Sequence, residues 1–300
     1  MIKTISFCNF FKPGKKFLFT MFLFLIAGSF FAQQNQEVEF IGMLTLRDSS
    51  LITYKINFKE TSNQKIEGYS VTDFYGSEKT KTKIEGYINR DKKTISFFET
   101  TNLATKSIAN TNEFCFVNVK NAKIKSKNNK SIIQGKFIGK FENDTNCMSG
   151  SFYLVGTDFL TKPEVNKDTA LNPRKESIAD LLKKADDLYL TSSEVLKLNW
   201  LSNEIKLELW DGLQFDQDKI SLIINDKIIL ENFIISKEKK AILVPFTEDV
   251  CKIEIIAVNE GKMPPNTVNI VLKDKNNSTP LVTKLKIGEK TTVVLSKSKK

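Results

Sequence analysis

Three aspartates in the segment WDGLQFDQD form the densest group of chemically capable side chains in this 300-residue chain. Asp211, Asp216 and Asp218 would present three carboxylates within one connection between two strands. Calcium in proteins takes roughly six to eight oxygen ligands, so the cluster is a candidate calcium site. The spacing does not follow the EF-hand pattern, and aspartates also cap the backbone of connecting loops. A calcium site and a structural turn therefore both stay open.

A few aromatic side chains are candidate ligand-binding residues. Trp210 alternates with Ile205, Leu207 and Leu209, which places it on the polar side of its strand beside the aspartates. An outward tryptophan can be a sugar platform or an interface anchor, or it can cover a domain junction.

Tyr69 and Tyr87 are the other two candidates, since each follows a Glu-Gly step in a repeated KIEGY pentapeptide. The alternation places them on the same strand face as Glu67 and Glu85. These four side chains could line a ligand surface, or they could form a solvated cross-strand ladder.

Most catalytic templates are excluded by the absence of histidine from the sequence. Serine triads and histidine-ligated zinc need that side chain, and neither a Gly-rich phosphate loop nor a C-x-x-C pair is present. We therefore expect no enzymatic activity. Paired carboxylates, as in glycoside hydrolases, remain an alternative, because spatial pairing is not visible in sequence. Glu99 is the acid of the first domain whose burial matters most, and we expect backbone donors to hold it.

The N-terminus predicts export. Four lysines precede an apolar run at 17–32, and the chain turns polar directly afterwards. This pattern is typical of a signal peptide at 1–32 with cleavage after Ala32, although Phe30 leaves an uncleaved anchor as an alternative. Removing the four lysines lowers the formal net charge from +10 to +6. We expect a protein of the periplasm or the extracellular space of a Gram-negative bacterium, with no membrane span after cleavage.

Cysteine usage agrees with an oxidising compartment. Cys8 lies in the predicted signal peptide, which leaves Cys115 and Cys147 as a disulfide 32 residues apart. Cys251 alternates with apolar residues and is expected to face the core. The lysine-rich stretch at 119–130 reads as a solvated strand face and turn, because a nucleic-acid site would need a broader patch with aromatic side chains among the lysines.

The first domain, predicted at 33–160, shows period-two alternation interrupted by short polar turns. Strands are expected at 37–46, 51–59, 65–75, 82–90, 93–99, 113–120, 131–141 and 147–155. Glycines stand on the apolar side of these strands at 68, 86, 135 and 150. A missing side chain there lets a strand bend or another backbone approach, which favours a curved antiparallel meander or a barrel-like sheet over a flat sandwich.

A polar, proline-containing linker is predicted at 161–176, followed by a short amphipathic helix at 177–190. The linker contains the tripeptide DTA, whose Thr169 matches a short bacterial O-glycosylation signal. The rest of the chain, 191–300, returns to period two and predicts a β-sandwich of seven or eight strands. These strands are expected at 205–210, 219–225, 227–235, 240–246, 251–258, 267–274, 279–288 and 291–296.

Two motifs in this second domain carry a resemblance to a known pattern. The segments LELWDGLQFDQDKISLIIND and IAVNEGKMPPNT are similar to a β-sandwich domain of exported bacterial proteins, with W-D-x-G-x-x-D-G-D-x-V-S-L-x-x-N-G and A-x-N-x-G-x-x-P-P-N-T. The resemblance spans about 205–296 and implies a fold but no biochemical function. Gln217 and Asp226 replace two glycines of the pattern. Asn259 and Asn266 could join the aspartates if the two loops share one end of the domain.

The sequence thus predicts an all-β, exported protein that binds an unknown protein or glycan of the cell envelope, without nucleic acid. A calcium-dependent carbohydrate-binding protein is the first alternative, and a carboxylate-dependent glycoside hydrolase is the second.

Overall fold

The computed structural model describes residues 37–73, 76–127, 130–157, 187–212, 215–275 and 277–298. The predicted signal peptide, the linker with Thr169 and the residues 177–186 of the predicted helix lie outside these ranges. Glu37–Lys300 forms one compact unit. Within the described ranges, no helix has the length and apolar character needed to cross a membrane.

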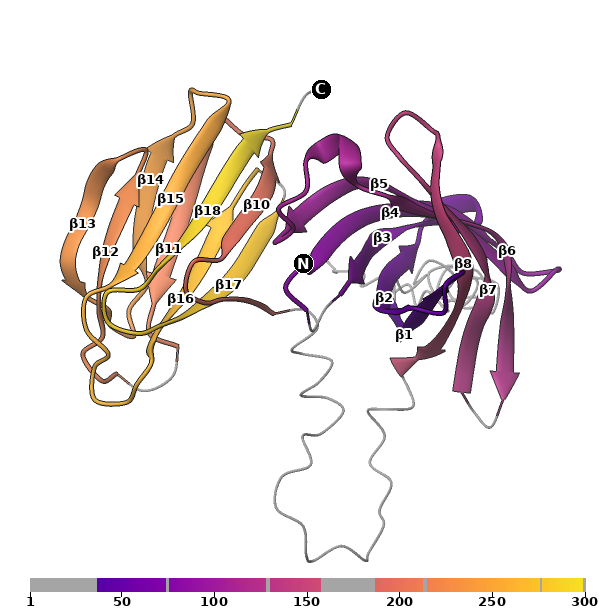
Figure 1. Ribbon diagram of the computed structural model, residues 1–300, viewed down its shortest axis with the longest axis horizontal. Coiled ribbons are helices and arrows are strands. Elements are labelled where there is room, and N and C mark those ends of the chain that lie inside the picture. The colour runs from indigo at the N-terminus through magenta and orange to yellow at the C-terminus, as the bar shows by residue number, and fades with distance from the viewer. Residues whose placement is uncertain are drawn as a thin grey trace, which may run out of the picture. The chain divides into compact units, whose positions relative to one another are not determined.

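The first eight strands close on themselves (Figure 1). Each pairs antiparallel with its neighbour in sequence, and β1 also pairs with β8. This eight-stranded barrel consists of β1 (Glu37–Leu46), β2 (Leu51–Glu60), β3 (Lys65–Thr72), β4 (Thr80–Asn89), β5 (Thr94–Thr105), β6 (Phe116–Lys127), β7 (Lys130–Lys140) and β8 (Asn146–Gly156). Short 3-10 turns at Ser62–Gln64 and Thr111–Glu113 precede β3 and β6. The predicted all-β class and the barrel-like first sheet are confirmed.

The barrel interior is filled by the apolar half of each alternating strand. Tyr54, Phe97 and Phe137 are almost fully buried there, together with Ile56, Ile66, Ile84, Ile95, Ile133 and Leu154. The intervening residues on the same strands point outward. The outer surface of the barrel is therefore where side chains are free to meet a partner.

The glycines allow neighbouring strands to approach closely. A Cβ atom at Gly68 would overlap the carbonyl oxygen of Asn57 in β2, and one at Gly86 would overlap that of Ser96 in β5. Gly150 stands in the same relation to β1, whereas at Gly135 the nearest atom is the Ala122 Cβ at 3.0 Å. The predicted mechanical role, the close approach of another backbone, is confirmed for Gly68, Gly86 and Gly150.

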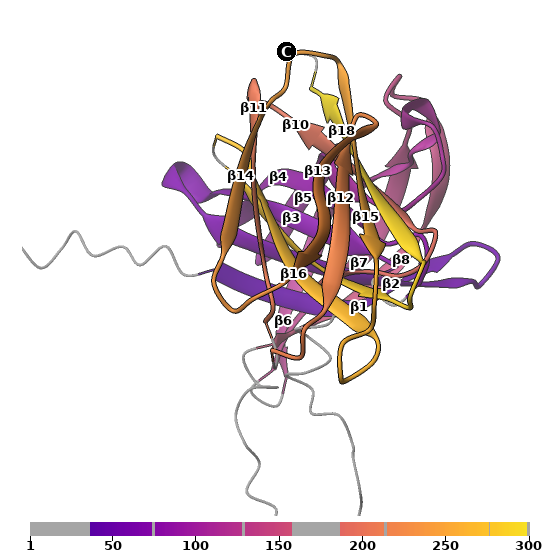
Figure 2. The same cartoon turned by 90° about the vertical axis from the view of Figure 1, so that its left-hand side faces the viewer.

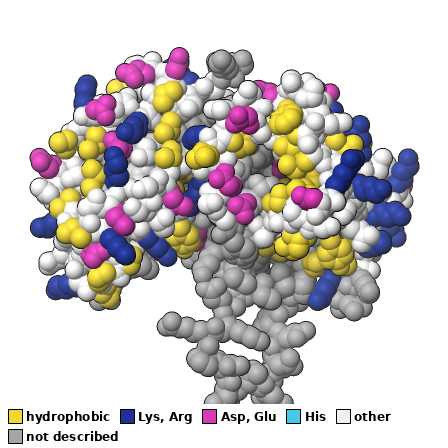
Figure 3. All heavy atoms as spheres, viewed as in Figure 1, with side chains coloured by type: hydrophobic (Ala, Val, Ile, Leu, Met, Phe, Trp, Pro, Cys, Tyr) yellow, Lys and Arg dark blue, Asp and Glu magenta, His cyan; other side chains and the backbone are white. Residues whose placement is uncertain are grey.

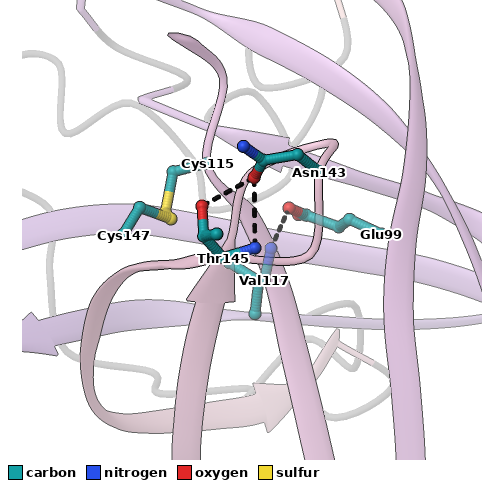
Figure 4. Close-up of a disulfide and its surroundings, with 6 residues drawn as sticks. All are labelled: Glu99, Cys115, Val117, Asn143, Thr145 and Cys147. Atoms are coloured by element: carbon teal, nitrogen blue, oxygen red, sulfur yellow. Dashed lines mark hydrogen bonds between the residues drawn. A yellow bond between two sulfur atoms is a disulfide. The ribbon is translucent and has the colours of Figure 1, made fainter. Parts of the chain in front are cut away.

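One disulfide joins Cys115, just before β6, to Cys147 in β8, with 6.0 Å between the Cα atoms. Gly139 in β7 makes room for it, because a Cβ there would overlap the Cys115 sulfur. Figure 4 shows the bond next to the turn in which the Asn143 Oδ1 accepts hydrogen bonds from the Thr145 backbone N–H and hydroxyl. The predicted pairing is confirmed.

The remaining ten strands form two layers around a second core, which Figure 2 shows from the side. One layer has the order β13-β12-β15-β18-β10, and the other has the order β14-β11-β16-β17-β9. The strands are β9 (Leu188–Leu190), β10 (Val195–Trp200), β11 (Glu204–Trp210), β12 (Lys219–Ile224), β13 (Lys227–Ile234), β14 (Lys240–Pro245), β15 (Val250–Ala257), β16 (Asn266–Lys273), β17 (Ser278–Leu285) and β18 (Lys290–Lys297). We call this part the two-layer module.

Cys251 lies in the core of the two-layer module and is 2% exposed. Burial raises the pKa of its thiol to about 11, and the charge of Glu248 adds to the effect. The expectation that this cysteine packs as a small apolar residue is confirmed.

The predicted helix at 177–190 is wrong at its C-terminal end. Leu188–Leu190 is strand β9, which pairs in parallel with β17. Leu188 and Leu190 are buried on one side while Tyr189 between them is half-buried, so the local period is two. Pairing with an existing sheet edge outweighs the weak helical spacing of so short a segment. The two-layer module therefore begins at β9 and includes β10, two strands that the sequence did not indicate.

The two parts of the chain share a sheet at β5 and β10. Thr105 pairs with Lys197 and Ala104 pairs with Leu198. Lys106 adds an ion pair to Glu194, with 2.9 Å between its nitrogen and the carboxylate oxygen.

The glycine geometry predicts a specific pattern of destabilisation. Gly86→Ala should lower the free energy of unfolding by about 2 kcal/mol or more, because the new methyl group forces the β4 and β5 backbones apart. Gly156→Ala is the matched control, since its nearest neighbour would be the Ser131 Cβ at 3.3 Å. Urea denaturation of both variants measures the difference. Equal losses would show that close backbone approach is not what requires Gly86.

Candidate functional site

The predicted aspartate cluster lies where two loops of the two-layer module meet. One loop follows β11 and contains the three aspartates, and the other connects β15 to β16. Asp216 Oδ2 accepts a hydrogen bond from the Met263 backbone N–H at 2.9 Å. Asp218 Oδ2 accepts one from the Thr267 backbone N–H at 2.8 Å. Asp216 and Asp218 thus bind backbone N–H groups of the second loop and of the start of β16, more than forty residues further along the chain.

Two asparagines, at the two ends of the second loop, bind the backbone of the first loop and of the start of β12. Asn259 Oδ1 accepts from the Lys219 N–H at 2.6 Å, and Asn259 Nδ2 donates to the Gln217 carbonyl at 3.0 Å. Asn266 Nδ2 donates to the Lys219 carbonyl at 3.0 Å. Side chains of each of the two motifs thus bind the backbone of the other. We call this set of hydrogen bonds between Asp216, Asp218, Asn259 and Asn266 and the facing backbone the interlock.

Gly261 belongs to the same interlock because of its backbone conformation. Its φ is +57°, and a Cβ there would lie 2.6 Å from the Asp216 carboxylate. Any other residue would be strained in this conformation and would also displace the carboxylate. The glycine thus allows the second loop to fold directly over Asp216.

The interlock holds buried negative charge. Asp218 is 2% exposed, and burial raises its carboxyl pKa to about 6. The hydrogen bond from Thr267 opposes that shift, while the charges of Asp216, Asp211 and Glu260 add to it. Among the residues that the structure describes, none is a hydrogen-bond partner of the buried Asp218 Oδ1 and Asn266 Oδ1. The folded chain therefore keeps the proton on Asp218 to a higher pH than the unfolded chain does.

The contacts favour the structural interpretation of the cluster. Asp216 and Asp218 flank Gln217, whose φ is +72°. Their carboxylates accept hydrogen bonds from two different peptide groups, those of Met263 and Thr267. Among the residues that the structure describes, no three acidic, histidine or cysteine side chains are placed to hold a metal ion. Calcium binding by Asp211, Asp216 and Asp218 stays a prediction.

The three candidate aromatic residues lie on three different strands. Trp210 ends β11, where Lys239 Nζ lies 4.5 Å from its ring centroid. Tyr69 lies in β3 and is half-buried, with Lys81 Nζ 3.8 Å from its ring centroid. Each of these two rings thus makes a cation–π contact with a lysine of the same chain. Tyr87 in β4 is 52% exposed.

A hollow on the outer face of the barrel surrounds Tyr87. Phe98 in β5 is 42% exposed and lines the same hollow. Glu85 lies directly opposite Phe98, and Tyr87 lies opposite Ser96, so the two rings are diagonal neighbours. The hollow has a volume of about 570 Å³ and is lined by Asn63, Gln64, Lys65, Ile66, Glu67, Glu85, Gly86, Tyr87, Ile88, Asn89 and Phe98.

The sequence indicated the carboxylate and tyrosine side of this hollow but not Phe98. Alternation could have found it, because adjacent phenylalanines in one strand must face opposite sides: Phe97 is buried inside the barrel and Phe98 points out. Lys83 Nζ lies 2.6 Å from Glu85 Oε1, which is an ion pair along β4 and not across two strands.

Glu99 is sequestered inside the barrel. Its carboxylate accepts hydrogen bonds from the Val117 N–H at 2.6 Å, the Ser70 hydroxyl at 2.5 Å and the Tyr54 hydroxyl at 2.9 Å. Figure 4 shows the bond from Val117. Burial raises the pKa of Glu99, and these three hydrogen bonds oppose the shift. The expected backbone donor is confirmed, and the two hydroxyl donors are additional.

Asp218 predicts an unusual dependence of stability on pH. Its carboxyl pKa is about 6 in the folded state, whereas that of an unperturbed aspartate is 3.8. A raised folded-state pKa stabilises the protein below the unfolded value, and that stabilisation is lost as pH rises through 6. Asp218→Asn should remove this pH-dependent component, on the order of 1–3 kcal/mol between pH 4 and pH 7, because an amide does not titrate. The amide oxygen can still accept the hydrogen bond from the Thr267 N–H. Chemical denaturation at several pH values measures it, with the exposed Asp226→Asn as control. If the free energy of unfolding of Asp218→Asn depended on pH as steeply as that of the wild type, Asp218 would not be the source of the pH dependence.

Comparisons with protein-family models, with curated proteins and with solved structures found no match. The resemblance of 205–296 to an exported β-sandwich domain therefore stays a prediction. The geometry of the two sites is what supports a function for this chain.

Proposed function

We propose that this chain is a non-enzymatic, exported binding protein of the cell envelope, and that its ligand occupies the hollow beside Tyr87 and Phe98. The observation that carries the proposal is the pair of exposed aromatic rings on the outside of a barrel whose interior is already filled. Exposed aromatic side chains beside polar groups that converge on one hollow are typical of binding sites.

A glycan is the ligand class that fits this hollow best. Aromatic rings stack on the C–H faces of sugar rings, and the amides of Asn63, Gln64 and Asn89 can bond to hydroxyl groups around them. Glu67 and Glu85 face each other across β3 and β4 and add acceptors for further hydroxyl or amino groups. A peptide ligand would find fewer apolar contacts in so polar a lining.

The contacts support binding rather than glycoside hydrolysis. A hydrolase needs a carboxylic acid with a raised pKa next to a second carboxylate at the substrate. The described carboxyl groups whose pKa is raised are Glu99 and Asp218, and both are buried in hydrogen-bonded networks. Glu67 and Glu85 lie instead on an open strand face.

Binding in this hollow needs no calcium. Asp211, Asp216 and Asp218 belong to the two-layer module, whereas every residue that lines the hollow belongs to the barrel. This separates the proposal from calcium-dependent carbohydrate binding through the aspartates and Trp210.

A direct test compares glycan binding by matched aromatic variants. The double variant Tyr87→Ala/Phe98→Ala should lose at least tenfold in affinity on a glycan array and for purified peptidoglycan, because it removes both stacking faces. Tyr153→Ala is the control, since Tyr153 is an equally exposed aromatic of β8 that does not line the hollow. Chelator should leave wild-type binding unchanged. Absence of wild-type binding to every glycan, or an equal loss in the control, would rule out the glycan assignment.

Export has its own test. Expressed in a Gram-negative host, the chain should be recovered outside the cytoplasm with Gln33 as its first residue, because signal peptidase cleaves after small side chains such as Ala32. Cell fractionation and intact-mass measurement check this. A full-length product in the cytoplasm would contradict export, whereas one held in the inner membrane would favour an uncleaved anchor.

A further inference from the structure

A second surface of the barrel concentrates positive charge. We call it the lysine face and define it by Lys93, Lys120, Lys123, Lys125 and Lys136, all of which are exposed. They come from the turn before β5, from β6 and from β7. Within the described part of the chain, none of the five forms a salt bridge. No acidic side chain of the described residues thus forms an ion pair that would neutralise this face.

Apolar side chains adjoin the lysine face on the same outer surface. Strand register places Lys123 opposite Gln134, Gln134 opposite Tyr153, and Tyr153 opposite Met43. Because the eight strands close into a barrel, the two strand steps from Lys123 to Tyr153 turn the outward direction by about a quarter of the circumference, and Met43 lies one step further around. Tyr153 is 50% exposed and Met43 is 40% exposed, and Ile138 on β7 is 48% exposed.

Figure 3 shows where lysine, arginine and hydrophobic side chains gather on one side of the molecule. Basic side chains gather over the part of the barrel where Figure 1 places β6, with hydrophobic side chains on the barrel surface beside them. On the side of the barrel that β6, β7 and β8 form, Ile138 and Tyr153 are exposed beside the lysines, and a partner that is apolar as well as anionic complements both kinds of side chain.

We propose that the lysine face and the adjoining Ile138 and Tyr153 dock the barrel onto the surface of an anionic phospholipid bilayer. Lipid phosphates complement the lysines, and each lysine near such a surface strengthens binding by about fivefold. Tyrosine partitions to the level of the headgroups, and the isoleucine reaches the acyl boundary.

A linear polyanion such as a nucleic acid or an acidic polysaccharide fits less well. It would pair with the lysines but would leave Ile138 and Tyr153 exposed to water. The docking surface is also separate from the hollow beside Tyr87, because none of its residues lines that hollow. The protein can therefore hold a ligand in the hollow while it rests on a bilayer.

Vesicle cosedimentation of the full chain tests this docking. Vesicles of equal parts phosphatidylglycerol and phosphatidylcholine are compared with pure phosphatidylcholine vesicles, which report any binding through the N-terminal apolar segment. Lys123→Glu/Lys125→Glu should weaken binding to the anionic vesicles at least tenfold. The control Lys227→Glu/Lys237→Glu has the same net charge and reverses two exposed lysines of the two-layer module, so it should bind within about twofold of wild type.

Tyr153→Ala separates a bilayer from other polyanions. It should weaken vesicle binding several-fold at both low and high salt, since the tyrosine contribution is not electrostatic. Circular dichroism and an intact Cys115–Cys147 bond establish that each variant is folded. Equal losses in the two lysine variants would overturn the proposal. So would wild-type binding that is the same for both vesicle types, or binding to heparin or DNA that is tighter than to vesicles and insensitive to Tyr153→Ala.

Discussion

Strand β5 satisfies hydrogen bonds on which both parts of the chain depend. Along its whole length it pairs with β4, while on its other edge Thr94–Phe98 pairs with β6 and thereby closes the barrel. The end of that second edge would be unpaired, and β10 covers it at Ala104 and Thr105. Because an unpaired strand edge invites association with other chains, the same strand closes one sheet and begins the next.

Much of the barrel follows from sequence alternation, and its closure does not. Each of the eight predicted segments became a strand, since alternation and turn residues are local signals. The pairing of β1 with β8 joins residues more than a hundred positions apart, and alternation contains no information about it. The KIEGY repeats pointed to curvature because their glycines admit a neighbouring backbone. Strands β9 and β10 were missed because short segments beside a helical spacing carry little signal.

The aspartate motif shows a similar limit at the level of a site. Its spacing in sequence is compatible with an ion, but spacing does not show where each carboxylate points. In the folded chain Asp216 and Asp218 reach the N–H groups of Met263 and Thr267, and Asn259 binds back. Phe98 was overlooked for the opposite reason, since it carries no charge and belongs to no motif. Its value comes from Tyr87 on the neighbouring strand.

The buried thiol of Cys251 affects how the chain matures. Three cysteines beyond the predicted signal peptide allow three different disulfides, of which one occurs in the structure. Thiol–disulfide exchange requires a thiolate that can reach a sulfur atom. With its pKa at about 11 and its side chain in the second core, Cys251 provides almost none at neutral pH. Once the two-layer module has folded, the correct bond is therefore protected from rearrangement without the help of an isomerase.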